Sequence, residues 1–158
     1  SGMDATGSSS QRSEILWRSI FVTLRNPAGI GFSNFPIVSI HHLQTHNAFT
    51  QVSAELGWFC LAAYVIFMVS PLRKLGIIER RMFLKDDSSW IYYLSIGLQA
   101  GIIGYMVSSF FASVAYQWYI YYPVAYAICL RRIYQLGQTE ETENAEAKGN
   151  NYLELREA

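Results

Sequence analysis

The stretch from Ser88 to Leu130 contains no Asp, Glu, Lys, Arg or His, which limits the fold more than any other feature of the sequence. A helix of a water-soluble protein needs a polar face toward solvent, so uncharged sequence of this length is unusual in a soluble fold. As one helix the stretch would be about 65 Å long, roughly twice the hydrocarbon core of a bilayer. It therefore predicts two membrane-spanning helices.

We expect an all-α fold of polytopic transmembrane helices with an extracytoplasmic helical loop region. The predicted spans cover residues 53–72, 90–110 and 118–132. A loop over residues 73–89 separates the first two and carries a cluster of Lys and Arg side chains. The positive-inside rule assigns this loop to the cytoplasm.

With this loop in the cytoplasm, the other parts of the chain can be assigned to a side of the membrane. Residues 1–52 are expected to be an extracytoplasmic segment and residues 133–158 a cytoplasmic tail. The tail is rich in glutamate and poor in apolar residues, which predicts that it is largely disordered. Nothing at the N-terminus resembles a signal segment, so we expect the chain to be a fragment preceded by earlier spans. The formal net charge is zero and no basic stripe is present, which argues against a nucleic-acid partner.

The extracytoplasmic segment is expected to contain two helix boundaries. Apolar residues at four-residue steps predict an amphipathic helix over residues 13–24, and Pro27 follows as a helix stop. A second helix is expected to begin near Thr45 or Asn47, because either side chain can cap a helix N-terminus. This second helix leads directly into the first predicted span.

Polar residues recur at four-residue steps where that helix approaches the membrane. Asn47, Gln51 and Glu55 would share one helix face, with His46 at its outer end. Glu55 has two interpretations: a carboxylate solvated among lipid headgroups, or one that lines a polar cavity, since a buried unpaired charge is costly. Histidine exchanges protons near neutral pH and could serve as a general acid or base.

Three arginines lie on the outer side, against the usual bias of positive charge toward the cytoplasm. They are Arg12, Arg18 and Arg25. One interpretation is that they are ordinary charges of an amphipathic helix that contact lipid headgroups.

Two further patterns are too incomplete to support a function. His42 and His46 have the spacing of two zinc ligands on one helix face, but no third ligand is evident, so no metal site is expected. Gly29 and Gly31 supply the backbone freedom of a tight turn. They lack the third glycine and the preceding strand of a dinucleotide-binding loop.

The order of these motifs resembles the C-terminal half of the O-antigen ligase and O-antigen polymerase superfamily of bacterial membrane glycosyltransferases. The resemblance covers residues 7–70. It is carried by a serine-rich lead-in, Arg12 followed by Trp17, Asn26-Pro27, Gly29-Ile30-Gly31-Phe32-Ser33-Asn34-Phe35, His46-Asn47, Gln51 and Glu55-Leu56-Gly57. Residues 71–135 match only in hydropathy and number of spans.

The resemblance implies a reaction and a location. Members of this family move a glycan from a polyprenyl-pyrophosphate carrier to a hydroxyl of a lipid A core, a polysaccharide or a protein. They act without a metal or other cofactor, on the outer face of the bacterial inner membrane. This sequence would then contain the end of the large periplasmic loop and the last three spans.

The resemblance also implies roles for particular residues. Arg12 would stabilise the leaving pyrophosphate, and His46 would take the proton of the acceptor hydroxyl. Residues expected to bind substrate or to orient this pair are Asn47, Gln51, Glu55, Gly29 and Gly31. The family's upstream arginine is absent from this sequence. The alternatives are a non-catalytic membrane transport or polysaccharide-export component and, less favoured, a histidine-metal membrane hydrolase.

Overall fold

The computed structural model describes residues 5–39, 43–85 and 89–157, and these are helical with no strand among them. Side chains are described within residues 11–39, 43–85 and 89–148. The elements are α1 (Ala5–Arg25), α2 (Phe35–Val38), α3 (Ala48–Leu84), α4 (Trp90–Ser109), the 3-10 helix η1 (Trp118–Ile120) and α5 (Tyr121–Glu157). The expected all-α fold is confirmed.

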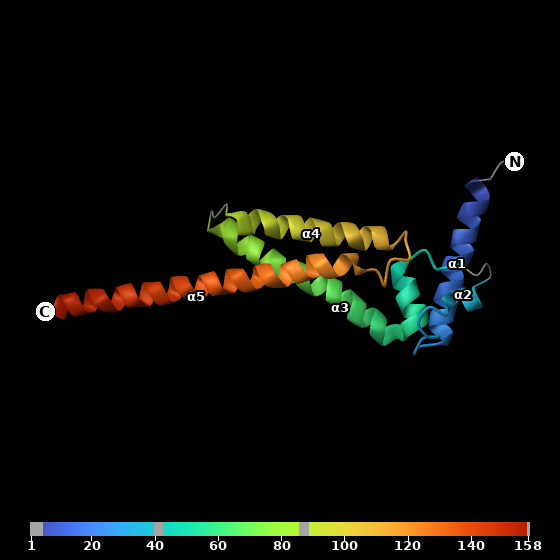
Figure 1. Ribbon diagram of the computed structural model, residues 1–158, viewed down its shortest axis with the longest axis horizontal. Coiled ribbons are helices and arrows are strands. Elements are labelled where there is room, and N and C mark those ends of the chain that lie inside the picture. The colour runs from blue at the N-terminus through green and yellow to red at the C-terminus, as the bar shows by residue number, and fades with distance from the viewer. Residues whose placement is uncertain (1–4, 40–42, 86–88, 158) are drawn as a thin grey trace.

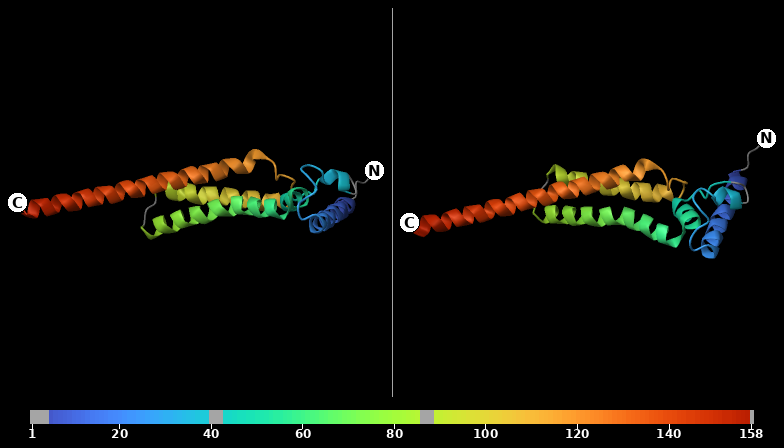
Figure 2. Two further views of the ribbon diagram at one scale, coloured as in Figure 1. Left: turned by 90° about the horizontal axis from the view of Figure 1, so that it is seen from below. Right: turned by 60° about the horizontal axis from the view of Figure 1, so that its bottom comes forward.

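Three long helices run side by side, and a fourth crosses one end of the bundle that they form. α3, α4 and the first part of α5 contact one another, whereas α1 lies across the end of α3 (Figure 1). Figure 2 shows the same arrangement from two other sides, with the C-terminal part of α5 extending beyond the other helices. The bundle therefore has an end covered by α1 and an opposite end from which α5 projects.

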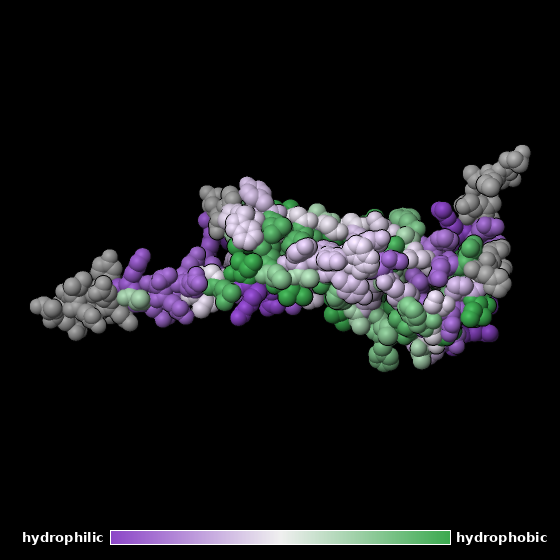
Figure 3. All heavy atoms as spheres, viewed as in Figure 1, coloured by the Kyte–Doolittle hydropathy of each residue, from purple (hydrophilic) through white to green (hydrophobic). Residues whose placement is uncertain are grey.

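The core of the bundle is apolar and draws on α3, α4, η1 and α5. Its fully or nearly buried members are Met68, Leu75, Ile102, Ile120, Val124, Ala127 and Leu130. A second, smaller core joins α1 to α2 and to the first turns of α3 through Ile15, Val22, Phe35 and Ala54. The sides of the bundle away from these cores remain largely apolar (Figure 3).

Two helices have the length and hydropathy of membrane spans, namely α3 and α4. Only 11% of the apolar window of α4 is buried within the protein. A core helix of a soluble protein would be mostly buried, whereas a helix in lipid exposes its apolar side chains to hydrocarbon. Association with a membrane is therefore the better explanation of this exposed apolar surface.

The predicted first and second spans lie in these two helices, but the predicted basic loop between them is largely helical. α3 continues through Arg73 and Lys74 to Leu84. The reason is a buried stripe at helical spacing, Leu75, Ile78 and Met82, which keeps this segment packed against the bundle. Pro71 lies within α3 without ending it.

The predicted third span and the predicted disordered tail form one continuous helix, α5, which starts at Tyr121. Although α5 has 37 residues, no described stretch of it is apolar enough to count as a candidate membrane span. The structure differs from the expected disorder of residues 133–158 in that the helix continues to Glu157. Ala, Gln, Lys and Glu are good helix formers and no proline interrupts the tail, so its composition permits a solvated helix.

Candidate functional site

α3 is broken near its N-terminus, and a loop between α1 and α2 packs into the break. Gly57 has φ 86° and ψ −178°, a backbone conformation open essentially only to glycine. The carbonyl oxygen of Ala54 accepts a hydrogen bond from the Ile30 amide at 3.0 Å, and that of Glu55 accepts one from the Gly31 amide at 2.9 Å. The loop therefore satisfies carbonyl groups that the break removes from the helix ladder.

Glycine is required on both sides of this contact. A Cβ atom at Gly29 would overlap the carbonyl oxygen of Glu55 and lie 2.7 Å from the Gly57 amide nitrogen. A Cβ atom at Gly57 would overlap the carbonyl oxygen of Pro27, which accepts a hydrogen bond of 3.1 Å from the Trp58 amide. Gly29 and Gly31, with φ of 83° and 101°, thus shape the loop through their backbone.

Asn47 begins α3 and connects it to the end of α4. Its Oδ1 accepts hydrogen bonds from the amides of Phe49 at 2.9 Å and Thr50 at 3.1 Å. This is an N-cap, and Asn47 is one of the two caps that the sequence offered. The Asn47 Nδ2 donates to the carbonyl oxygen of Phe110 at 3.3 Å. The same side chain therefore defines the start of one candidate span relative to the end of the other.

His46 precedes this cap in an uncommon conformation. Its φ is 51°, in the left-handed region that non-glycine residues seldom occupy. The His46 amide donates a hydrogen bond of 2.9 Å to Ser113 Oγ, in the loop after α4. The backbone of His46 is thus held by Ser113 at its own amide and by the N-cap at the next residue, Asn47. Among the described residues its imidazole forms no hydrogen bond, which leaves both ring nitrogens available.

Arg12 and His46 line one hollow of about 230 Å³. The other lining residues are Ser13, Leu16, Thr45, Asn47, Phe110 and Phe111. They come from α1, from the segment before α3 and from the end of α4. Within the described part of the chain the Arg12 guanidinium has no hydrogen-bond or ion-pair partner. The hollow therefore combines a free cation, an imidazole and apolar walls.

Glu55 does not reach this hollow and is instead a buried connector. Its side chain is 1% exposed. Its Oε1 accepts a hydrogen bond from the Phe35 amide at 3.2 Å, and its Oε2 accepts one from the Tyr116 hydroxyl at 2.7 Å. Burial, together with this hydrogen bond to Glu55, raises the pKa of Tyr116 well above its ordinary value. Of the two interpretations drawn from the sequence, neither headgroup solvation nor a place in the pocket wall describes Glu55.

Gln51 likewise lies behind the hollow. Its Nε2 donates to Gln44 Oε1 at 3.2 Å, and its side chain is 4% exposed. The predicted stripe therefore divides: Asn47 lines the hollow beside His46, whereas Gln51 and Glu55 support the segments around it. Sequence reasoning missed the contribution of residues 110–116, although this stretch is the outer turn between two predicted spans.

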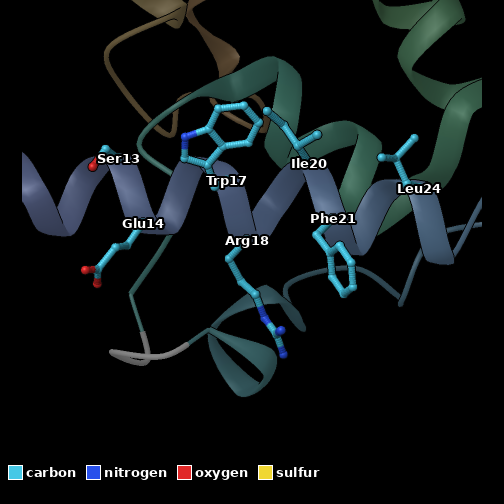
Figure 4. A pocket seen from close by; sticks show the side chains of 7 residues that line it. All are labelled: Ser13, Glu14, Trp17, Arg18, Ile20, Phe21 and Leu24. Atoms are coloured by element: carbon cyan, nitrogen blue, oxygen red, sulfur yellow. The ribbon is translucent and has the colours of Figure 1, made fainter.

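The other two arginines of α1 take part in contacts of their own. Arg18 Nε donates to the carbonyl oxygen of Val38 at 3.3 Å, and the Arg25 guanidinium lies 4.6 Å from the centre of the Phe21 ring. Arg18 also borders a groove of about 520 Å³, whose lining comes from α1 alone. Figure 4 shows the side chains that line this groove, which project on both sides of α1. The groove is an open helix surface and holds neither Arg12 nor His46.

The described residues contain no group of three or more His, Cys, Asp or Glu side chains able to hold a metal ion. His41 and His42 lie outside the described residues. No family model, no curated protein sequence and no solved structure matches the chain. The function proposed below therefore depends on the geometry of the hollow and on the motifs of the sequence.

Proposed function

We propose that this chain is part of a membrane glycosyltransferase that moves a glycan from a polyprenyl-pyrophosphate carrier to a hydroxyl acceptor. The observation that carries the proposal is the common hollow of Arg12 and His46 at the end of the two candidate spans. The motif order that resembles O-antigen ligases and polymerases gives the reaction. The acceptor would be a lipid A core, a polysaccharide or a protein.

The reaction breaks the bond between the anomeric carbon of the sugar and the pyrophosphate oxygen, and it forms a new bond from that carbon to the acceptor oxygen. Negative charge grows on the departing pyrophosphate. The Arg12 guanidinium supplies charge-assisted hydrogen bonds to phosphate oxygens, which stabilise this charge in the transition state. Among the described residues it has no hydrogen-bond or ion-pair partner, so no described contact has to be broken before it binds phosphate.

The acceptor hydroxyl loses its proton as it attacks, and His46 receives that proton on a ring nitrogen. The hydrogen bond between the His46 amide and Ser113 and the cap formed by Asn47 hold the backbone of this segment, so the residue that carries the imidazole has a defined position. Phe110 and Phe111, which are largely exposed, supply apolar surface beside the reacting groups.

The hollow is smaller than most complete ligand sites, which measure about 300–1,000 Å³. At about 230 Å³ it would enclose the reacting ends of donor and acceptor. The rest of the lipid and glycan would extend along surfaces outside it. The proposed location is the outer face of the bacterial inner membrane, with residues 1–52 periplasmic and the basic end of α3 cytoplasmic.

The test is a glycan-transfer assay on membranes that contain the full-length protein and a polyprenyl-pyrophosphate-linked donor. We expect His46→Ala and Arg12→Ala each to reduce transfer by about 100-fold or more, the scale of a lost general base or transition-state donor. The matched controls are Arg25→Ala, another outer arginine of α1, and Gln44→Ala. Transfer should also persist in the presence of EDTA.

The competing interpretation, a non-catalytic transport or export component, gives the opposite result. In that case both variants keep transfer in isolated membranes while export of the finished polysaccharide falls in cells. Variants that insert and accumulate like the wild type but retain full transfer would overturn the proposal. Loss of transfer on removal of divalent ions would favour the metal hydrolase interpretation instead.

A further inference from the structure

Two adjoining hollows lie between α3 and α5, away from the candidate catalytic site. The first, of about 220 Å³, is lined mostly by apolar side chains that include Ile66, Phe67 and Ile128. The second, also of about 220 Å³, is lined in part by cations. Lys74 and Arg131 line both hollows, so the two form one groove that is apolar at one end and basic at the other.

The basic end has three cations from two helices. Arg81 joins Lys74 from α3 and Arg131 from α5 in the wall of the second hollow. Within the described residues none of the three forms an ion pair or a hydrogen bond. Glu79, an acid on the same part of α3, accepts a hydrogen bond of 2.7 Å from Gln99 on α4. The positive charge of the groove is thus left without a described counter-charge.

The apolar end opens toward the surroundings of the bundle. Ile66 is 64% exposed and Ile128 is 62% exposed. Ile66 precedes Lys74 on α3 and lies nearer the middle of that candidate span. Ile128 precedes Arg131 on α5 and lies in the apolar first turns of that helix. Ile66 precedes Lys74 by about 12 Å of helix at 1.5 Å per residue. A ligand in the groove would therefore place a charged group at the end of the span and an apolar chain beside it.

We infer that this groove binds an anionic phospholipid, with its phosphate between Lys74, Arg81 and Arg131 and one acyl chain along Ile66 and Ile128. Basic pockets between membrane helices bind anionic headgroups in this way, and Lys and Arg place donors on phosphate oxygens. The adjoining apolar hollow distinguishes a phospholipid from free phosphate, which would leave that hollow unused. The inference concerns a separate site and does not depend on the proposed glycan transfer.

The experiment measures lipid binding by the purified full chain in neutral detergent. Fluorescent phosphatidylglycerol is the probe, with phosphatidylcholine of the same chain length and inorganic phosphate as competitors. We expect phosphatidylglycerol to bind at least about ten-fold more tightly than phosphatidylcholine, since each Lys or Arg near an anionic headgroup adds attraction. Inorganic phosphate should compete poorly. Equal competition by inorganic phosphate would overturn the lipid assignment in favour of a simple anion site.

The decisive variants remove equal charge at neighbouring positions. Lys74→Ala/Arg131→Ala should weaken phosphatidylglycerol binding by about ten-fold or more. The matched control is Arg80→Ala/Arg132→Ala, which removes two exposed cations from the same helices that line neither hollow. An equal loss in both double variants would mean diffuse attraction to a basic surface and would contradict a defined site.

A second variant tests the apolar half without changing charge. Ile128→Trp should fill part of the first hollow and lower the affinity for phosphatidylglycerol while leaving that for inorganic phosphate unchanged. This variant also serves if Lys74→Ala/Arg131→Ala fails to fold. Unchanged phosphatidylglycerol binding by a folded Ile128→Trp variant would show that no acyl chain lies there and would overturn the proposal.

Discussion

The Tyr116 hydroxyl donates a hydrogen bond of 2.7 Å to the buried carboxylate of Glu55, 61 residues earlier in the chain. Glu55 also accepts from the Phe35 amide at 3.2 Å. One carboxylate therefore joins the loop after α4, the broken start of α3 and the first turn of α2. Ser113, which holds the His46 amide, belongs to the same loop as Tyr116. The connector thus fixes the surroundings of the candidate site without entering it.

Breaking this connector should destabilise the protein and disturb the site indirectly. We expect Tyr116→Phe and Glu55→Ala each to lower the free energy of unfolding by about 1–3 kcal/mol, because each leaves a buried polar group without its partner. In a double-mutant cycle the two changes should be clearly non-additive. Thermal unfolding in detergent measures this, with Tyr119→Phe as the control. Additive effects would show that the two side chains do not interact.

The raised pKa of Tyr116 gives this connector a dependence on alkaline pH. Burial favours the neutral phenol in the folded state, so the pKa there lies above the ordinary 10.0 of the unfolded state. The stabilisation is fully present below pH 10 and is lost as the pH rises above it. Between pH 8 and pH 11 the free energy of unfolding should therefore decline more steeply for the wild type than for Tyr116→Phe. Parallel declines would contradict this assignment.

The contact between Gly29 and Gly57 predicts an asymmetry among the glycines. Gly57→Ala and Gly29→Ala should each cost about 2 kcal/mol or more, because both positions combine a positive φ with backbone atoms where the Cβ would lie. Gly101→Ala is the matched control, since a Cβ there meets nothing within 4 Å. The measurement is thermal stability together with the yield of folded protein. Equal tolerance at all three positions would rule out the packed break in α3.

Asn47 has two separable roles, which two substitutions distinguish. Asn47→Ala removes the N-cap and should lower the free energy of unfolding by about 0.5–2 kcal/mol. Asn47→Asp keeps an acceptor for the amides of Phe49 and Thr50 but loses the bond donated to Phe110. We therefore expect Asn47→Asp to restore most of the stability. If it is as unstable as Asn47→Ala, the bond to Phe110 is the more important of the two.

The sequence indicated the helices well because their signals are local. The uncharged run, the capping residues and the apolar periodicity depend on neighbouring residues. They predicted the bounds of α4 to within a residue and the end of α1, whereas α1 begins eight residues before the predicted start and Asn47 was one of two predicted caps for α3. The glycine turn was also recognisable, since only glycine adopts its backbone angles freely. The continuous α5 was missed because composition alone does not distinguish a solvated helix from a disordered tail.

The site was only partly predictable, because its walls come from segments far apart in the chain. Arg12 and His46 were named from their motifs, and the structure brings them to one hollow. Spacing on a helix could not show that Glu55 turns away toward Tyr116. The orientation of Glu55 depends on its contacts with α2 and with the loop after α4. These segments are far from Glu55 in the sequence, so the spacing of residues along one helix cannot reveal the contacts.

The proposed function requires that Arg12 and His46 share a hollow on the outer side of the membrane. Cysteine cross-linking tests this requirement directly. The full-length protein would carry Arg12→Cys and His46→Cys with the free cysteines Cys60 and Cys129 changed to serine. The control pairs His46→Cys with Arg25→Cys, about 20 Å further along the axis of α1.

The predicted result is that a short, membrane-impermeant bifunctional thiol reagent links positions 12 and 46 in intact cells but does not link positions 25 and 46. Absence of the link between positions 12 and 46, or its formation only after permeabilisation, would contradict the account.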